Sequence, residues 1–137
     1  MKEQLCQEFC ERLRIRETPA GLSVGTGFAG LDGDPIGFYV IGPDENNRFR
    51  IEDNGATVPV LEACGADLDI AKRAEIFRGL LEQYGVHYDE RSFELKTTAM
   101  SYEEIPKAAL RFVALMLRLQ DLTFLSRENA ESSICRG

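Results

Sequence analysis

The sequence has few basic residues for its length. Its 137 residues include 16 Lys and Arg against 23 Asp and Glu, which gives a formal net charge of −7 and an isoelectric point near 4.8. A protein that binds nucleic acid directly needs clustered Lys and Arg to neutralise phosphates. The acidic balance therefore argues against a domain that binds DNA or RNA itself.

Long apolar runs are also missing. The longest candidate, residues 108–117, contains Arg111 and is followed by Arg118, so we expect no membrane-spanning helix. Residues 1–16 are amphipathic and charged, without the uninterrupted apolar stretch of a secretory signal. We therefore expect a cytoplasmic protein that does not bind membranes.

Metal-ligating side chains are sparse and scattered. There is one histidine, His87, and four cysteines at positions 6, 10, 64 and 135, without the close pairs of a zinc site. Cys6 and Cys10 lie one helical turn apart on an apolar face, where buried thiols are the commoner arrangement. We expect no metal, no cofactor, and a burial role for these two cysteines.

The length and the 44% hydrophobic content fit one domain with an ordinary core, over residues 1–126. Residues 127–137 lack periodicity and are expected to form a flexible tail. Apolar spacing predicts helices over residues 2–14, 57–64, 69–84 and 101–126, and strands over 22–26, 36–41, 48–52, 86–88 and 92–96. This order predicts an α+β fold: an N-terminal helix, an antiparallel meander, and helices packed on one sheet face.

The last predicted helix has the clearest start signal. Ser101 and Glu104 have the spacing of a capping box, and a long, mostly apolar segment follows. A helix that is apolar around most of its circumference lies in the core or pairs with another copy. We favour the core, and keep a homodimer through residues 101–126 as an alternative.

The negative charge is concentrated in one stretch. Residues 28–69 contain nine acids and two bases, whereas acids and bases cancel on either side. A carboxylate-rich surface could bind a basic partner. Acids in turns also satisfy the local backbone, and the sequence does not tell whether they share one face. The candidate partner-binding residues are Asp32, Asp34, Asp44, Glu45, Glu52 and Asp53.

Two motifs fail on their surroundings. The glycines at 25, 27 and 30 match a dinucleotide-binding spacing, but no helix start follows them, so we expect a loop at a strand end. Asp32-Gly33-Asp34 resembles the opening of a calcium loop, yet Ile36 and Gly37 stand where an oxygen ligand and the turn glycine belong. Neither motif supports a binding site.

One enzymatic alternative is left open. Glu94 and Lys96 on a predicted strand have the acidic-x-Lys spacing of metal-dependent nucleases, with Asp53 or Asp89 as a further carboxylate. An exposed strand face that carries Glu and Lys is far commoner. His87 has no catalytic Ser or Cys context. We therefore expect a protein that is not an enzyme.

Several segments together resemble a known family. They are Gly33 to Ile36, the Asp53-Asn54-Gly55 turn, Gly65-Ala66-Asp67 and Tyr84-Gly85-Val86. In this order they resemble the bacterial, archaeal and phage family called domain of unknown function 1828. The resemblance implies a stand-alone cytoplasmic domain from mobile-element genes, where inhibitors of host defence are frequent, and it supplies no catalytic residues.

From the charge map and this resemblance we expect an acidic, non-enzymatic interaction module. Its expected partner is the basic surface of a host protein or protein–nucleic-acid complex, such as a defence complex.

Overall fold

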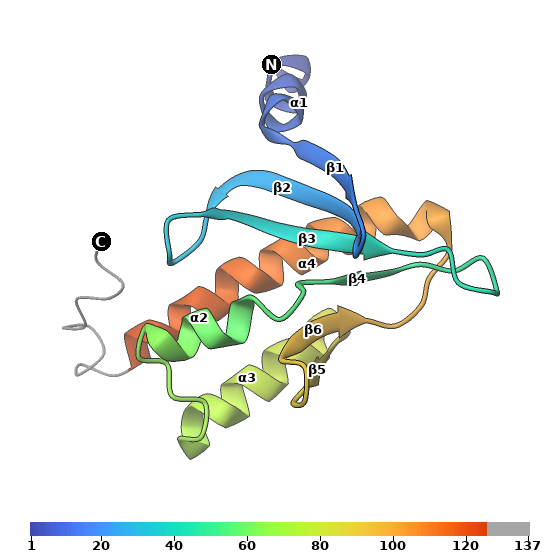
Figure 1. Ribbon diagram of the computed structural model, residues 1–137. Helices are drawn as coiled ribbons and strands as arrows, with labels where there is room; N and C mark the ends of the chain where they lie inside the picture. The colour runs from blue at the N-terminus through green and yellow to red at the C-terminus, as the bar shows by residue number, and fades with distance from the viewer. Residues whose placement is uncertain (126–137) are drawn as a thin grey trace.

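One antiparallel sheet of six strands organises the computed structural model, which describes residues 1–125 (Figure 1). The strands are β1 (Arg14–Thr18), β2 (Gly21–Ala29), β3 (Pro35–Ile41), β4 (Arg50–Glu52), β5 (Val86–Asp89) and β6 (Glu94–Thr97). Their order in the sheet is β1-β2-β3-β4-β6-β5. Strands β2, β3 and β4 form the expected meander, and β1 adds a strand that was not predicted. The second hairpin joins the meander through β6, which leaves β5 at an edge.

Within residues 1–125, four α-helices accompany the sheet: α1 (Lys2–Arg12), α2 (Thr57–Ala63), α3 (Ala71–Tyr84) and α4 (Ile105–Gln120). The 3₁₀ helices η1 (Tyr102–Glu104) and η2 (Asp121–Leu125) flank α4. α2, α3 and α4 cover one face of the sheet, whereas α1 projects from it beside β1 (Figure 1). The predicted α+β fold, with helices on one sheet face, is confirmed.

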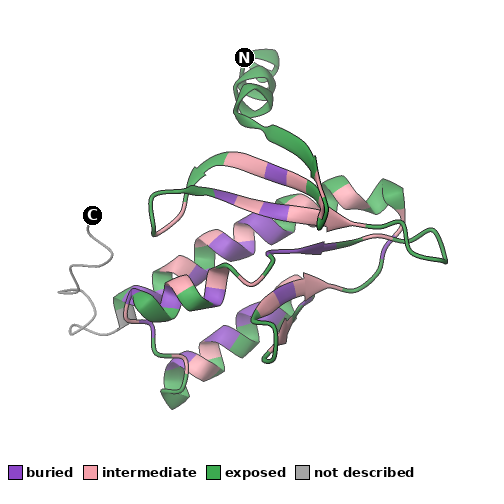
Figure 2. Ribbon diagram, in the orientation of Figure 1, coloured by how far each residue is buried: buried purple, intermediate pink, exposed green. Residues whose placement is uncertain are grey.

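The core lies between the sheet and α4. Ile51 and Leu95 of the sheet are fully buried, as are Leu115 and Leu119 of α4. Inward and outward side chains alternate along the strands, which is the pattern of a sheet with one covered face. Figure 2 shows the buried residues along α4 and the central strands. The expected central position of this helix is confirmed.

Local signals explain where the helices begin and end. Ser101 and Glu104 form the predicted capping box, in which the Ser101 backbone N–H and Oγ both donate to Glu104 Oε1 (3.3 and 2.9 Å). Gly85 ends α3 with a φ of 67°, a left-handed conformation that glycine adopts without the steric cost of a side chain.

The N-terminal region differs from the prediction. The first helix ends at Arg12, two residues before its predicted end, and Arg14–Thr18, where no strand was predicted, forms strand β1. The strand predicted over residues 22–26 continues to Ala29, so residues 27–29, expected in a loop at its end, lie within β2. Gly25 and Gly27 of the motif therefore lie in a strand and Gly30 follows it, without the helix start that a dinucleotide site requires.

The expected burial of the N-terminal thiols is wrong. None of the α1 residues is buried, and Cys6 and Cys10 are exposed together with Leu5 and Phe9 (Figure 2). α1 contacts the rest of the protein mainly at β2, where the rings of Phe9 and Phe28 lie 6.5 Å apart. The apolar stripe of α1 therefore faces outward.

No helix within residues 1–125 is long and apolar enough to cross a membrane. The predicted flexible tail, residues 127–137, lies outside the described residues, as does the last predicted residue of the domain, Ser126.

Candidate interaction surfaces

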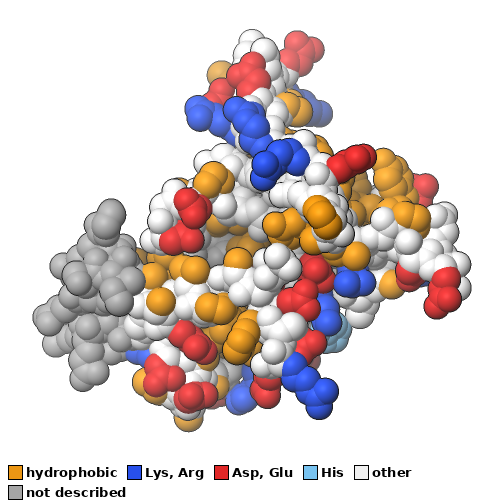
Figure 3. All heavy atoms as spheres, viewed as in Figure 1, with side chains coloured by type: hydrophobic (Ala, Val, Ile, Leu, Met, Phe, Trp, Pro, Cys, Tyr) orange, Lys and Arg blue, Asp and Glu red, His pale blue; other side chains and the backbone are white. Residues whose placement is uncertain are grey.

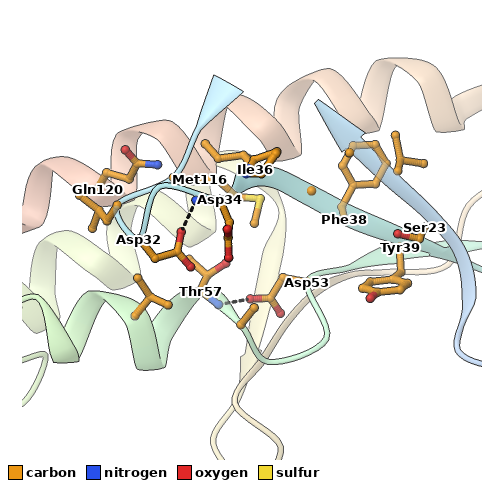
Figure 4. A pocket seen from close by; sticks show the side chains of 18 of the residues that line it. Ser23, Asp32, Asp34, Ile36, Phe38, Tyr39, Asp53, Thr57, Met116 and Gln120 are labelled. Carbon is orange, nitrogen blue, oxygen red and sulfur yellow. Dashed lines mark hydrogen bonds between the residues drawn. The ribbon is translucent and has the colours of Figure 1, made fainter. Parts of the chain in front are cut away.

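A pocket of about 340 Å³ lies between the β2–β3 loop, strand β3 and the start of α2 (Figure 4). Asp32 and Asp34 of that loop reach its rim, and both are exposed. Asp32 Oδ1 accepts a hydrogen bond from the Asp34 N–H at 3.1 Å, which shapes the turn. Both side chains are therefore accessible from solvent.

Asp53 lines the same pocket but is only 3% exposed. Its Oδ1 accepts hydrogen bonds from the N–H groups of Gly55 (3.0 Å) and Leu95 (2.8 Å), and its Oδ2 accepts one from Thr57 (2.9 Å). This carboxylate joins the end of β4 to β6 and to the first turn of α2. This burial does not agree with the predicted role of Asp53 on an exposed docking surface.

Glu52 is also buried, with 5% of its surface exposed. Arg50 Nε donates to its Oε2 at 3.1 Å. Burial raises the pKa of Glu52 most, and the nearby Glu94 carboxylate raises it further, whereas the hydrogen bond from Arg50 lowers it. Like Asp53, this side chain is withdrawn from solvent and does not contribute to an exposed acidic surface.

Asp44 and Glu45 lie in the β3–β4 loop, at the opposite end of β3 from Asp32 and Asp34 (Figure 1). Both are exposed, and Asp44 Oδ1 accepts hydrogen bonds from the N–H groups of Asn46 and Arg48. The seven residues of β3 separate the two loops by roughly 20 Å, at about 3.3 Å per residue. The six candidate carboxylates thus form two exposed pairs and one buried pair, not one patch.

On the face shown in Figure 3, acidic side chains form several separate groups and not one continuous patch. Arginines gather instead around α1 and β1, the end of the sheet farthest from β5 (Figures 1 and 3).

The residues of the enzymatic alternative are engaged with one another. Lys96 Nζ donates to Asp89 Oδ2 at 3.4 Å, and Lys96 lies opposite Glu52 in the sheet. Glu94 lies next to Glu52, while Asp53 is held by three backbone N–H groups. Within residues 1–125 no group of three His, Cys, Asp or Glu side chains could hold a metal ion.

A larger hollow, of about 840 Å³, lies between α3 and β5. Its apolar lining includes Phe77 and Leu81 of α3 and Val86 and Tyr88 of β5, and the rings of Phe77 and Tyr88 pack edge to face at 5.6 Å. We call this hollow the α3–β5 groove. Four exposed carboxylates lie around it: Glu62, Asp69, Glu82 and Glu90.

These four acids outnumber the bases of the groove, where Arg78 is the single Lys or Arg among the lining residues. Burial raises the pKa of Tyr88 most, and the carboxylates of Glu62 and Glu90 raise it further, as do those of Asp53 and Asp89. A negative potential at the groove therefore favours positively charged partners.

The sequence reasoning missed this site. Its four acids come from α2, the α2–α3 loop, α3 and the β5–β6 turn, and only two of them fall in the acidic stretch 28–69. Phe77 and Leu81 are buried in the core, as the apolar spacing of this helix indicates, so that spacing gave no separate signal for a groove.

Comparison with known proteins gives one match. A family model described as "Domain of unknown function DUF1828" matches residues 26–119. The matched region runs from within β2 to near the end of α4 and includes the α3–β5 groove, whereas α1 and β1 precede it. No curated protein and no solved structure matches the chain.

Proposed function

The chain belongs to the family described as domain of unknown function DUF1828, and we propose that it is a non-enzymatic module that binds a partner protein through acidic side chains. One observation carries this proposal: the α3–β5 groove combines an apolar lining with four exposed carboxylates and a single arginine. An apolar floor supplies affinity, and a charged rim supplies orientation and a fast encounter with a basic partner.

The partner class that we propose is a nucleic-acid-handling complex of a host cell, met in the cytoplasm. Such complexes carry Lys and Arg surfaces that bind phosphates. Carboxylates that occupy the same Lys and Arg side chains would compete with nucleic acid, so a phage or mobile element could use this protein as an inhibitor of host defence. The exposed pairs Asp32–Asp34 and Asp44–Glu45 are further candidate contacts for a large partner.

The test compares two variants with the same change in charge. The groove variant is Glu62→Gln, Asp69→Asn, Glu82→Gln and Glu90→Gln. The loop variant is Asp32→Asn, Asp34→Asn, Asp44→Asn and Glu45→Gln. Each raises the net charge by four, and the amide oxygens of the loop variant can still accept the turn hydrogen bonds.

Each protein is immobilised and used to capture partners from a host lysate at low and high salt, with identification by mass spectrometry. We expect the wild type and the loop variant to retain one nucleic-acid-handling complex that high salt releases, and the groove variant to lose it. Binding of the purified complex, with and without nucleic acid as competitor, then tests the inhibition. Equal retention by all three proteins would contradict an electrostatic interaction.

A further inference from the structure

Strand β5 (Val86–Asp89) is an edge of the sheet with nothing paired to its outer side in the described part of the chain. In an antiparallel sheet, alternate residues of an edge strand direct their N–H and C=O groups away from the sheet. Such an edge can accept another strand unless charge, proline or a covering element prevents it. β5 contains no Lys, Arg or Pro, and its one acid, Asp89, forms an ion pair with Lys96 of the neighbouring strand β6.

The other edge strand is different. β1 carries Arg14 and Arg16, which lie opposite Gly25 and Ser23 of β2. Paired arginines on an edge oppose the addition of a second basic strand and protect the sheet against pairing with itself. The two edges of this sheet are therefore not equivalent, and β5 is the one without this protection.

The open edge of β5 borders the α3–β5 groove. The groove is lined from one side by Ala74, Phe77 and Leu81 of α3 and from the other by Val86 and Tyr88 of β5. A strand added to β5 would thus lie beside α3, with every second side chain directed to the helix-covered side of the sheet. The apolar lining suits large apolar side chains at those positions.

Phe93 gives the end of the groove an unusual shape. It is 50% exposed and has a φ of 63°, which bulky residues rarely adopt. Its N–H donates to the Asp89 carbonyl at 2.8 Å, so the β5–β6 turn maintains this conformation. The result is an exposed aromatic ring at the groove, close to Glu90 in the same turn.

We propose that an extended segment of the partner protein, in which Lys or Arg alternates with large apolar residues, adds to the open edge of β5 as a seventh strand. This inference rests on the proposed function and specifies how the partner binds. The apolar side chains enter the groove, and the basic ones pair with the surrounding carboxylates. A helical segment satisfies its own backbone hydrogen bonds and would leave the β5 edge unused.

The experiment uses the full chain and a synthetic ten-residue probe in which Lys alternates with Val, Leu and Phe. Two further probes have the same sequence and carry N-methyl groups on two alternate backbone nitrogens. Because alternate residues of a strand face opposite sides of its hydrogen-bonding plane, one probe is methylated on one set of alternate nitrogens and the other probe on the other set. Affinities are measured by fluorescence anisotropy. Amide hydrogen exchange of residues 86–89 is measured with and without probe, and light scattering gives the mass of the free protein.

We expect the unmodified probe to bind and to slow exchange in β5. One N-methyl set should weaken binding about tenfold, the effect of losing two backbone hydrogen bonds, and the other set much less. The double variant Glu82→Lys and Glu90→Lys should weaken binding more than Asp44→Lys and Glu45→Lys, which carries the same charge change away from the groove.

Two results would overturn the addition of a strand from a partner protein and leave the proposed function standing. In the first, the probe binds with equal affinity after either N-methylation and without protection of β5, while the groove variant still loses partner capture. In the second, the free protein grows in mass with concentration, and the β1 variant Arg16→Glu abolishes that growth. The occupant would then be the Arg14-Ile15-Arg16 edge of a second copy. Failure of both probe binding and groove-dependent capture would overturn both proposals.

Discussion

The carboxylate of Asp53 accepts a hydrogen bond from the backbone N–H of Leu95, 42 residues later in the chain, at 2.8 Å. The same side chain accepts N–H groups from Gly55 and Thr57. One buried acid thus connects the meander, the second hairpin and α2. Its carboxylate accepts hydrogen bonds from backbone N–H groups that would otherwise lack partners inside the protein.

We predict that Asp53→Ala destabilises the protein by about 3 kcal/mol, because it leaves buried donors unsatisfied. Urea unfolding followed by circular dichroism measures the change. Asp44→Ala is the matched control, since it removes an acceptor of two backbone N–H groups from an exposed loop, and should cost about 1 kcal/mol or less. Similar losses for both variants would contradict the structural role of Asp53.

Asp53 also illustrates what could be predicted from the sequence. The Asp-Asn-Gly turn was recognisable at 53–55, as were the capping box at Ser101 and the helix end at Gly85. These signals are local, since each depends on residues a few positions apart. The partner of Asp53 across the sheet is not local, so the same residue was assigned to a docking surface.

The remaining errors have related causes. β1 has five residues, and its Arg-Ile-Arg alternation is too short to separate a strand from the end of an amphipathic helix. The apolar spacing of α1 indicated a buried face, but spacing cannot tell what a face packs against. The α3–β5 groove needs acids from four segments, and only the folded chain brings them together.

The position of α4 leads to a prediction within one helix. Phe112 is 1% exposed and its ring lies 6.2 Å from that of Phe38, whereas Leu110 is 76% exposed. Phe112→Ala should destabilise the protein by about 4 kcal/mol through loss of burial and a residual cavity. Leu110→Ala should change the stability by less than about 0.5 kcal/mol. If Leu110→Ala were instead strongly destabilising, its face would be covered in solution, as in the homodimer considered from the sequence.

The outward stripe of α1 makes a different prediction. Phe9 is 60% exposed and contacts Phe28, which is itself 42% exposed. We expect Phe9→Ala to change the free energy of unfolding by less than about 1 kcal/mol, since little apolar surface is withdrawn from water. Phe38→Ala, on the core side of β3, should cost about 3–5 kcal/mol. A large loss for Phe9→Ala that depends on protein concentration would show that α1 is covered by another copy.

Glu52 gives the protein a defined pH dependence. Its pKa in the folded protein is raised above the ordinary value of 4.5, chiefly by burial. Between 4.5 and that higher pKa, the folded state binds more protons than the unfolded state, so the contribution of Glu52 to stability falls as the pH rises. Glu52→Gln removes this titration but keeps the shape of the side chain.

The free energy of unfolding of Glu52→Gln relative to the wild type should therefore increase as the pH rises from about 4.5 towards neutrality. Taking the difference between the two proteins removes the opposite contribution of Asp89, whose pKa is lowered mainly by a hydrogen bond from the Arg91 backbone. The contribution of Asp89 to the stability of the protein is lost as the pH falls. Urea unfolding at half-unit pH steps measures the difference, and a flat or falling curve would contradict the raised pKa of Glu52.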